Sequence, residues 1–343
     1  MNFKLMKIVF VFFLLFGIFT GRTMAQELIK AAVSDIDPAA KQLYQSALMN
    51  MDAQNADYDM QLMINMPMGN LVAAGDFQYQ KSPLLMKNII KAQFFTMEKQ
   101  QFPIFSMTQY VQAADEQLLI YSSDGQPEKK EKWYLQRYPL ADSLKRNIFL
   151  LPTGEQYAKQ VQDIVDAVKI IHAENENAGI QRLNIAFDSK KLFDNKRHVS
   201  FSDIDTSLSP EDKKGMANIL NDLFMVLQNS SDVSGTVDID VNTHKIVRTE
   251  LDLTDQIRIV AKAAYAAMAA EEEKTGGSEE QTTAAVDKPG INIIKDNAAV
   301  QDVIDHSTAR VIIKVKPIDN VMKLALPQEV RDSAKEMKPL KKI

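Results

Sequence analysis

The 343-residue chain contains no cysteine. It can therefore form no disulfide, no thiolate nucleophile and no zinc site built on sulfur. Its histidines are too widely spaced for a His-x-x-x-His metal pair, and we expect two of them, His244 and His306, to be exposed in a turn and beside a polar stretch. The chain therefore lacks the residues for thiol catalysis and for a metal site built on a closely spaced pair of histidines.

Catalytic motifs are also missing. The chain has no Gly-x-Ser-x-Gly elbow and no phosphate-binding loop, and no histidine is paired with a nucleophile in sequence. The acid pairs Asp203/Asp205 and Asp238/Asp240 lack the further oxygen ligands and the glycine turn of a calcium loop, so we interpret them as solvent-facing strand positions. We expect no enzymatic activity, no cofactor and no metal.

Positive charge is in the minority, with 40 Lys and Arg against 45 Asp and Glu and a net charge of −5. The balance becomes more negative if residues 1–25 are removed, because they hold three bases and no acid. An acidic chain is a poor partner for nucleic acid and for anionic lipid surfaces. We expect neither as a partner.

The one long apolar run lies at the N-terminus. Lys4 and Lys7 precede the apolar residues 8–19, and Thr23-Met24-Ala25 offers small residues at a cleavage point. The run is shorter than the roughly 20 residues that span a bilayer. We predict a signal peptide over residues 1–25 and a periplasmic or secreted mature chain with no integral membrane span. Retention of the run as an uncleaved anchor is the alternative, and the lack of cysteine excludes a bacterial lipoprotein anchor.

Alternating apolar and polar residues dominate the rest of the chain and predict strands. The predicted strands lie closest together between residues 58 and 138, where short polar turns separate them, as in an antiparallel meander. A hairpin with one wet face follows later, turning at residues 242–245. The predicted strands cover residues 58–66, 71–80, 84–97, 104–113, 117–122, 132–138, 182–187, 198–203, 236–241, 246–254 (with a continuation at 257–263), 310–316 and 321–326.

Three helices are predicted, one before the strands and two between them. The first begins at Asp37 with Pro38 at its first position and ends near Asn50. The second begins with the capping box of Thr153 and Gln156 and extends through Ile171, with His172 at its end. The third begins at Ser209 and carries an apolar stripe to Leu227.

The predicted elements describe an α+β fold. Many strands with few helices favour one strongly curved antiparallel sheet, with helices packed in its concave side. Residues 26–343 are expected to form a single domain. Residues 266–290, rich in Ala, Glu, Gly and Thr, are interpreted as a flexible insertion whose start is compatible with a short helix.

Methionine is concentrated on the early strands. Nine of the 17 methionines lie between Met49 and Met107, with several phenylalanines nearby. Methionine suits surfaces that adapt to varied apolar partners, so the cluster is either a hydrophobic ligand cavity or a Met-rich core. The cavity candidates, taken from these strands and the second helix, are Met60, Leu62, Ile64, Met66, Phe77, Met86, Phe105, Met107, Val161, Ile164 and Val168.

Short motifs in four places carry a family resemblance. They are Pro83-Leu84-Leu85-Met86-Lys87, Trp133-Tyr134, the hairpin of Gly235 to Asp240 with Thr243-His244-Lys245-Ile246, and Asp319-Asn320-Val321 with Leu326-Pro327-Gln328-Glu329-Val330. Together they resemble the LolA/LppX-like group of bacterial envelope proteins, and within it a family of uncharacterised Firmicute-type envelope domains.

This resemblance implies a half-open antiparallel barrel whose apolar cavity holds a lipid or the acyl chain of a lipoprotein. The chain departs from many relatives in having no lipidated cysteine, so tethering to a membrane does not carry over. From the resemblance we expect a non-enzymatic extracytoplasmic binding protein for a lipid or another hydrophobic small molecule. The alternative is a structural or interaction module of the cell envelope with a fully packed interior.

Overall fold

The computed structural model describes residues 35–50, 55–80, 82–123, 132–139, 155–174, 178–193, 225–274, 297–316 and 324–336. The predicted signal peptide, the predicted strand over 198–203 and most of the predicted helix from Ser209 lie outside these ranges. Residues 225–228, at the end of that helix, are helical.

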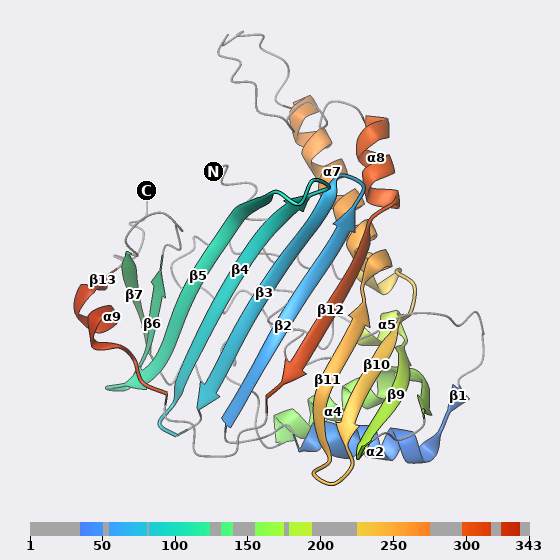
Figure 1. Cartoon of the computed structure of the whole chain (residues 1–343), viewed down its shortest axis with the longest axis horizontal. Coiled ribbons are helices and arrows are strands. Elements are labelled where there is room, and N and C mark those ends of the chain that lie inside the picture. The colour runs from blue at the N-terminus through green and yellow to red at the C-terminus, as the bar shows by residue number, and fades with distance from the viewer. Residues whose placement is uncertain are drawn as a thin grey trace.

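The described strands form one 13-stranded sheet that does not close on itself (Figure 1). Its order is β1-β8-β9-β10-β11-β12-β2-β3-β4-β5-β6-β7-β13. All neighbours pair antiparallel except β1 with β8 and β13 with β7. The strands are β1 (Asp35–Ile36), β2 (Asn55–Met66), β3 (Gly69–Gln80), β4 (Leu85–Thr96), β5 (Gln101–Ala114), β6 (Gln117–Ser123), β7 (Trp133–Pro139), β8 (Val168–Ala173), β9 (Ile180–Phe187), β10 (Val233–Asp240), β11 (Lys245–Asp252), β12 (Thr308–Val315) and β13 (Lys335–Glu336).

The alternation seen in the sequence gives the sheet two different faces. Leu62 of β2 pairs with Val311 of β12, and both belong to the main buried core. Their neighbours Gln61 and Ile312 lie on the opposite side, because side chains alternate along a strand. We call the side that carries Leu62 the inner face and the side that carries Gln61 the outer face.

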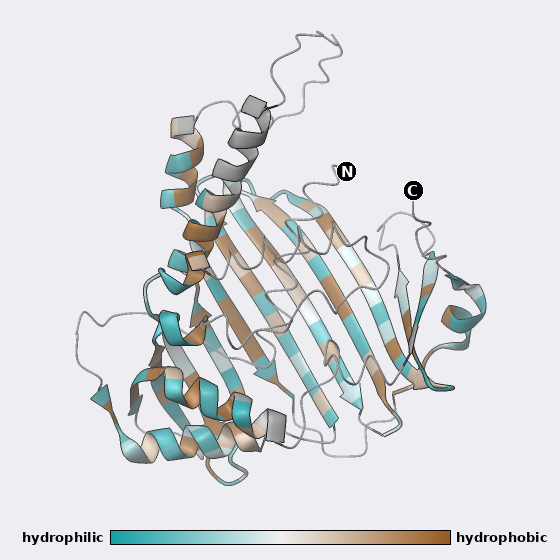
Figure 2. Cartoon of the chain, turned by 180° about the vertical axis from the view of Figure 1, so that it is seen from behind, coloured by the Kyte–Doolittle hydropathy of each residue, from teal (hydrophilic) through white to brown (hydrophobic). Residues whose placement is uncertain are grey.

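Helices pack on the inner face at one end of the sheet (Figure 2). Asp37 caps α2 (Pro38–Met49) as predicted, since its Oδ1 accepts from the backbone N–H groups of Ala39 and Ala40 at 2.8 and 3.3 Å. α2 contacts β8, β11 and α4 (Glu155–Ala167), and α4 contacts β8 and α5 (Ser189–Leu192). The main core lies here, between these helices and strands β8 to β12 and β2.

Two further helices, α7 (Thr254–Lys274) and α8 (Asn297–Asp305), contact one another, and α7 also packs against β12. The predicted continuation of the hairpin as a strand over 257–263 is wrong, because these residues form the first turns of α7. Its apolar residues Ile257 and Val260 pack into the main core at helical spacing. The start of the expected insertion is helical as far as Lys274.

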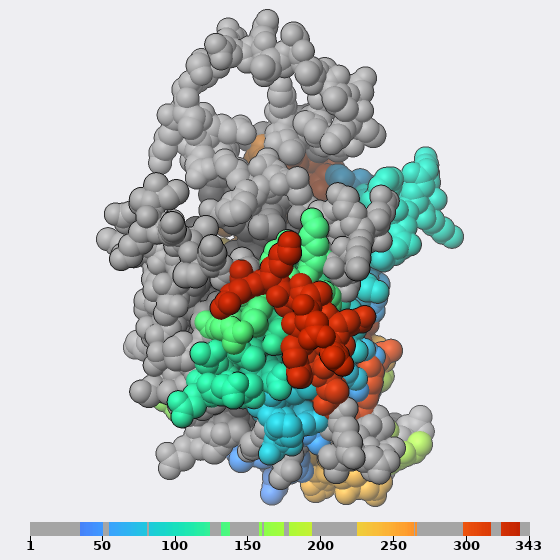
Figure 3. Space-filling view, turned by 90° about the vertical axis from the view of Figure 1, so that its left-hand side faces the viewer, coloured from blue at the N-terminus to red at the C-terminus, as the bar shows by residue number. Residues whose placement is uncertain are grey.

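A second core lies on the outer face. Tyr110, Leu119, Tyr121, Trp133 and Leu135 of β5 to β7 are covered by Leu326 and by Val330 of α9 (Gln328–Ser333). Figure 3 shows this C-terminal segment, in red, lying against the green strands β6 and β7. Residues 324–326, the described part of the predicted strand over 321–326, form no strand. They serve as cover for the sheet rather than as part of it.

The second predicted helix is too long. α4 ends at Ala167, and Val168 to Ala173 form β8, so Val168, Ile171 and His172 lie on a strand. The run Val-Lys-Ile-Ile is rich in β-branched residues and is equally compatible with a helical stripe and a strand. Pairing with β9 decides the outcome. The short edge strands β1 and β13 and the helices α5, α8 and α9 were not predicted.

Candidate ligand-binding face

Strand register brings the predicted cavity residues of β2 to β5 onto one surface. Met60 lies opposite Gly75, which lies opposite Ile90, which lies opposite Met107. Directly opposed residues in antiparallel strands share a face. By the same register the inner face carries all eight strand candidates, namely Met60, Leu62, Ile64, Met66, Phe77, Met86, Phe105 and Met107.

Burial divides these residues into two groups. Met60, Leu62 and Ile64 are 3%, 3% and 6% exposed and belong to the main core. The candidates from the second predicted helix join the same core. Val161 and Ile164 lie on α4, and Val168 lies on β8. α4 is therefore part of the packed interior, and these positions are core residues.

The partly exposed candidates are Met66 on β2 and Phe77, Met86, Phe105 and Met107 on β3 to β5. We define the inner strip as six of the half-buried apolar residues on the inner face of β3 to β5: Leu71, Ala73, Phe77, Phe94, Phe105 and Met107. Met86, further along β4, packs instead against a small third cluster of Val111, Leu118 and Ile120. Met66 and Phe77 pack against the edge of the main core. The strip thus continues the main core as an apolar surface that is only half buried.

Small residues lie next to the large side chains of the inner strip. Ala73 and Ala92 are directly opposed, and Gly75 follows on the same face of β3. Larger side chains stand on either side, with Leu71 and Phe94 in one row and Phe77 in another. Small residues therefore alternate with large apolar ones on this part of the inner face, and the Phe77 ring lies over Gly75.

Phe77 packs its ring against two residues of the sheet. Its ring stacks on Tyr58 with centroids 5.2 Å apart and planes 15° apart. The ring also lies over Gly75, since a Cβ built there would sit 2.2 Å from the Phe77 ring. The aromatic wall at this end of the inner strip is therefore set by the sheet itself.

A polar row borders the inner strip beyond Phe77. Asn88 donates to the Gln109 Oε1 at 3.2 Å, and Gln109 donates to the Ser122 hydroxyl at 3.3 Å. Asn88 lies opposite Phe77 in the register and is buried. The strip is consequently apolar in its body and polar at one border.

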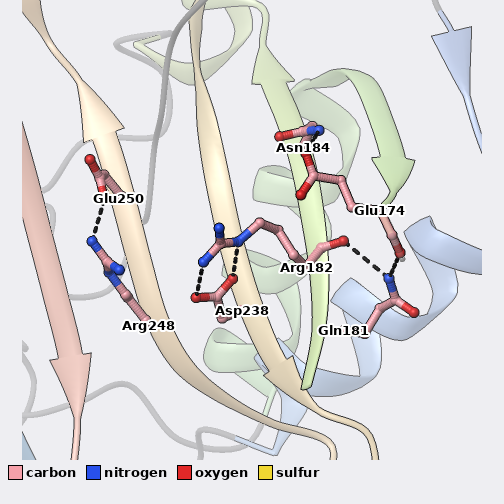
Figure 4. Close-up of polar contacts among 7 residues, drawn as sticks. All are labelled: Glu174, Gln181, Arg182, Asn184, Asp238, Arg248 and Glu250. Carbon is pink, nitrogen blue, oxygen red and sulfur yellow. Dashed lines mark hydrogen bonds and ion pairs between the residues drawn. The ribbon is translucent and has the colours of Figure 1, made fainter. Parts of the chain in front are cut away.

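The outer face over β9 to β12 carries charged side chains that form ion pairs with one another (Figure 4). Arg182 donates to both carboxylate oxygens of Asp238, at 2.7 and 2.9 Å, and this contact raises the pKa of Arg182. Glu250 accepts from Arg248 and, at 2.7 Å, from Arg310. Ion pairs of this density leave the outer face unsuited to an apolar ligand.

Asp238 departs from the expected solvent-facing position. It lies on the outer face as predicted, but its residue exposure is only 7%, because Arg182 covers it. Asp240 accepts instead from the backbone N–H groups of Thr243 and Asn242, at 2.9 Å each, in the hairpin turn. These bonds lower the pKa of its carboxyl group. Asp203 and Asp205 lie outside the described residues.

Lys316 gathers three carboxylates at the other end of the same face. Its Nζ lies 2.8 Å from Asp59, 3.3 Å from Asp57 and 3.4 Å from Asp76. The hydrogen bond to Asp59 raises the pKa of the lysine, with smaller contributions from Asp57 and Asp76. The ammonium group compensates the acids that β2 and β3 bring together here.

The histidines do not converge. His172 lies 3.0 Å from Asp35, across the β1–β8 pair, while His244 and His306 are exposed as predicted. His198 lies outside the described ranges. Within the described part of the chain, no three His, Asp or Glu side chains are grouped to hold a metal ion. In the same part of the chain, no helix has the length and hydropathy needed to cross a bilayer.

Comparison with known proteins adds little. No family model matches the chain, and no curated protein matches it in sequence. Among solved structures the chain is similar to the lipoprotein LppX of Mycobacterium tuberculosis. The TM-score is 0.32 and the identity 10%, over 84% of this chain and 100% of LppX.

Sequence reasoning missed part of the strip. Alternation predicts strands over residues 71–80 and 84–97, but of the strip residues on these two strands only Phe77 is among the predicted cavity candidates. Leu71, Ala73 and Phe94 are not among them. Joining these residues to Phe105 and Met107 requires the register between β3, β4 and β5, which no local pattern contains.

Proposed function

We propose that this chain is an exported, non-enzymatic binding protein that holds an acyl chain or a similar elongated apolar molecule against the inner strip. The observation that carries the proposal is the half-buried apolar surface of β3 to β5, continuous with the main core. Burial of its exposed area by a ligand supplies favourable free energy at about 25 cal/mol per Å².

The chemistry of the two faces supports this choice. The inner strip offers aliphatic and aromatic contacts with no charged group among its six residues. The outer face over β9 to β12 presents ion pairs that an apolar molecule would have to desolvate. The outer face over β9 to β12 is therefore less favourable for an apolar ligand than the inner strip. The N-terminal run at residues 8–19, with its small-residue cleavage point, supports export.

Matched methionine substitutions on opposite faces test the proposal. Met107 is in the inner strip, whereas Met63 lies on the outer face, opposite Val72 and Arg310. Met→Gln keeps side-chain length and removes apolar character. We expect Met107→Gln to weaken binding of a fluorescent fatty acid by roughly fivefold, equivalent to ~1 kcal/mol of lost apolar contact, and Met63→Gln to leave it unchanged.

Fluorescence titration of the full chain and both variants gives the affinities, and urea unfolding of each checks that the fold is retained. Equal affinities for the two variants would count against the inner strip as the binding surface. A chain that binds no fatty acid at all would favour the alternative, a structural module of the envelope whose sheet faces serve only packing.

A further inference from the structure

Large exposed apolar side chains gather at the tips of two neighbouring hairpins. Met68 lies in the β2–β3 turn and is 36% exposed, and Met97 lies in the β4–β5 turn and is 73% exposed. Phe102, near the start of β5, is 49% exposed. The register pairs Gly69 with Thr96, so Met68 and Met97 project from adjacent points at the same end of the sheet (Figure 1).

The tips are held in shape by their backbones. In the β4–β5 turn the N–H of Thr96 donates to the Gln100 carbonyl at 3.0 Å, and the N–H of Lys99 donates to the Thr96 carbonyl at 2.9 Å. The Thr96 hydroxyl accepts from the N–H of Gln100 at 3.2 Å. In the neighbouring turn, Gly69 lies against the Phe95 carbonyl. Met97 lies within this hydrogen-bonded turn.

The tips expose three large apolar side chains among polar residues and carry no net charge. Within residues 67–70 and 96–103 the only charged residues are Glu98 and Lys99, which cancel one another. Apolar side chains on protruding turns match the interfacial region of a lipid bilayer, where burial of apolar area supplies the attraction. Because the tips have no net charge, that attraction needs no anionic lipid.

The tips also connect with the inner strip. Phe102 lies opposite Phe94, and Phe94 lies opposite Leu71, so apolar side chains follow one another from the β4–β5 tip into the strip. A protein partner fits the tips less well, since two narrow turns offer little of the roughly 800 Å² per partner that a stable protein interface buries.

We propose that the β2–β3 and β4–β5 tips insert Met68, Met97 and Phe102 into the surface of an electrically neutral phospholipid bilayer. This step goes beyond ligand binding and does not depend on it, because the tips bury their own apolar area in the bilayer. It places one end of the inner strip at the membrane surface.

The absence of native cysteine permits a site-specific test. A Met97→Cys variant of the full chain is labelled with a polarity-sensitive dye and mixed with phosphatidylcholine vesicles. The matched control is Met49→Cys, at an exposed methionine at the end of α2. That site lies by the β10–β11 turn, where Asn50 donates to the His244 carbonyl at 3.1 Å. The dye at position 97 is expected to shift its emission to the blue, and the dye at position 49 to stay unchanged.

Vesicle flotation gives a second readout without a label. Replacing Met97 and Phe102 together by Asp is expected to lower partitioning by on the order of tenfold, whereas Met49→Asp leaves it unchanged. The apolar run at residues 8–19 is common to all these proteins, so the differences report on the tips. Raised salt is expected to have little effect.

Three results would overturn the proposal. The first is equal behaviour of the position 97 and position 49 variants. The second is binding that appears only when the vesicles contain anionic lipid. The third is a blue shift that arises without vesicles and grows with protein concentration, which would show instead that the tips join copies of the chain.

Discussion

Two glycines of β3 show how strongly single positions constrain this sheet. Gly69 has φ +147°, and a Cβ built there would lie 2.2 Å from the backbone oxygen of Phe95. At Gly75 the nearest obstruction is the Phe77 ring, a side chain that can move. The first glycine is required by backbone conformation and close approach, and the second only by the placement of a ring.

The two glycines give different expectations for the same substitution. Gly69→Ala is expected to lower the free energy of unfolding by about 3 kcal/mol, through backbone strain and contact with β4. Gly75→Ala is expected to cost about 1 kcal/mol, because the Phe77 ring can tilt off its stack with Tyr58. Urea unfolding followed by circular dichroism measures both. Similar losses for the two variants would contradict this distinction.

Also at the residue scale, the sequence did not predict that the charged residue Asp238 is buried. The spacing of Asp238 and Asp240 predicted their face correctly, because alternation is local. It could not reveal that Arg182, 56 residues away in sequence, pairs with Asp238 and buries it. Ion pairs across strands depend on which strands are neighbours, and single-strand patterns carry no such information.

At the scale of elements, the C-terminal segment is the cover of the second core. Leu326 and Val330 pack on Trp133, Tyr121 and Tyr110, and β13 adds two residues of parallel pairing to the edge strand β7. Such a cover shields apolar side chains and protects an edge strand from pairing with other chains. Trp133 is the only tryptophan of the chain, so its fluorescence reports on this cover directly.

Val330→Asp is therefore expected to detach the C-terminal segment. An unpaired carboxylate cannot stay buried beside Trp133, so the emission of that residue should move to the red and the free energy of unfolding should fall by about 2 kcal/mol. Gln328→Asp, which places the same side chain at an exposed position of α9, serves as control and should leave both unchanged. An unshifted emission in Val330→Asp would mean that the segment does not cover Trp133.

Element prediction succeeded where the sequence pattern was long and failed where it was short. The strands of the meander and of the later hairpin extend over seven to 14 residues, and alternation identified all of them. β8 has six residues and followed a helix without a break, so its apolar residues were read as a continuation of the helical stripe. β1 and β13, with two residues each, have no pattern to detect.

At the scale of the whole molecule, the central feature is a sheet whose inner face changes character along its width. Under α2 and α4 it is a closed core, and over β3 to β5 it is a half-buried apolar strip. The sequence predicted an apolar face but not this division. The insertion of β12 between β11 and β2 joins residues about 250 apart, and no local pattern predicts it.

The most direct test of the proposed function is native mass spectrometry of the protein purified from its own host under mild conditions, followed by extraction and identification of any apolar molecule. We expect a fraction of the chains to carry an added mass that organic solvent removes and that corresponds to a lipid or fatty acid. Repeated preparations in which every chain has its bare mass, and which take up no fatty acid when it is supplied, would contradict a ligand-holding role for the inner strip.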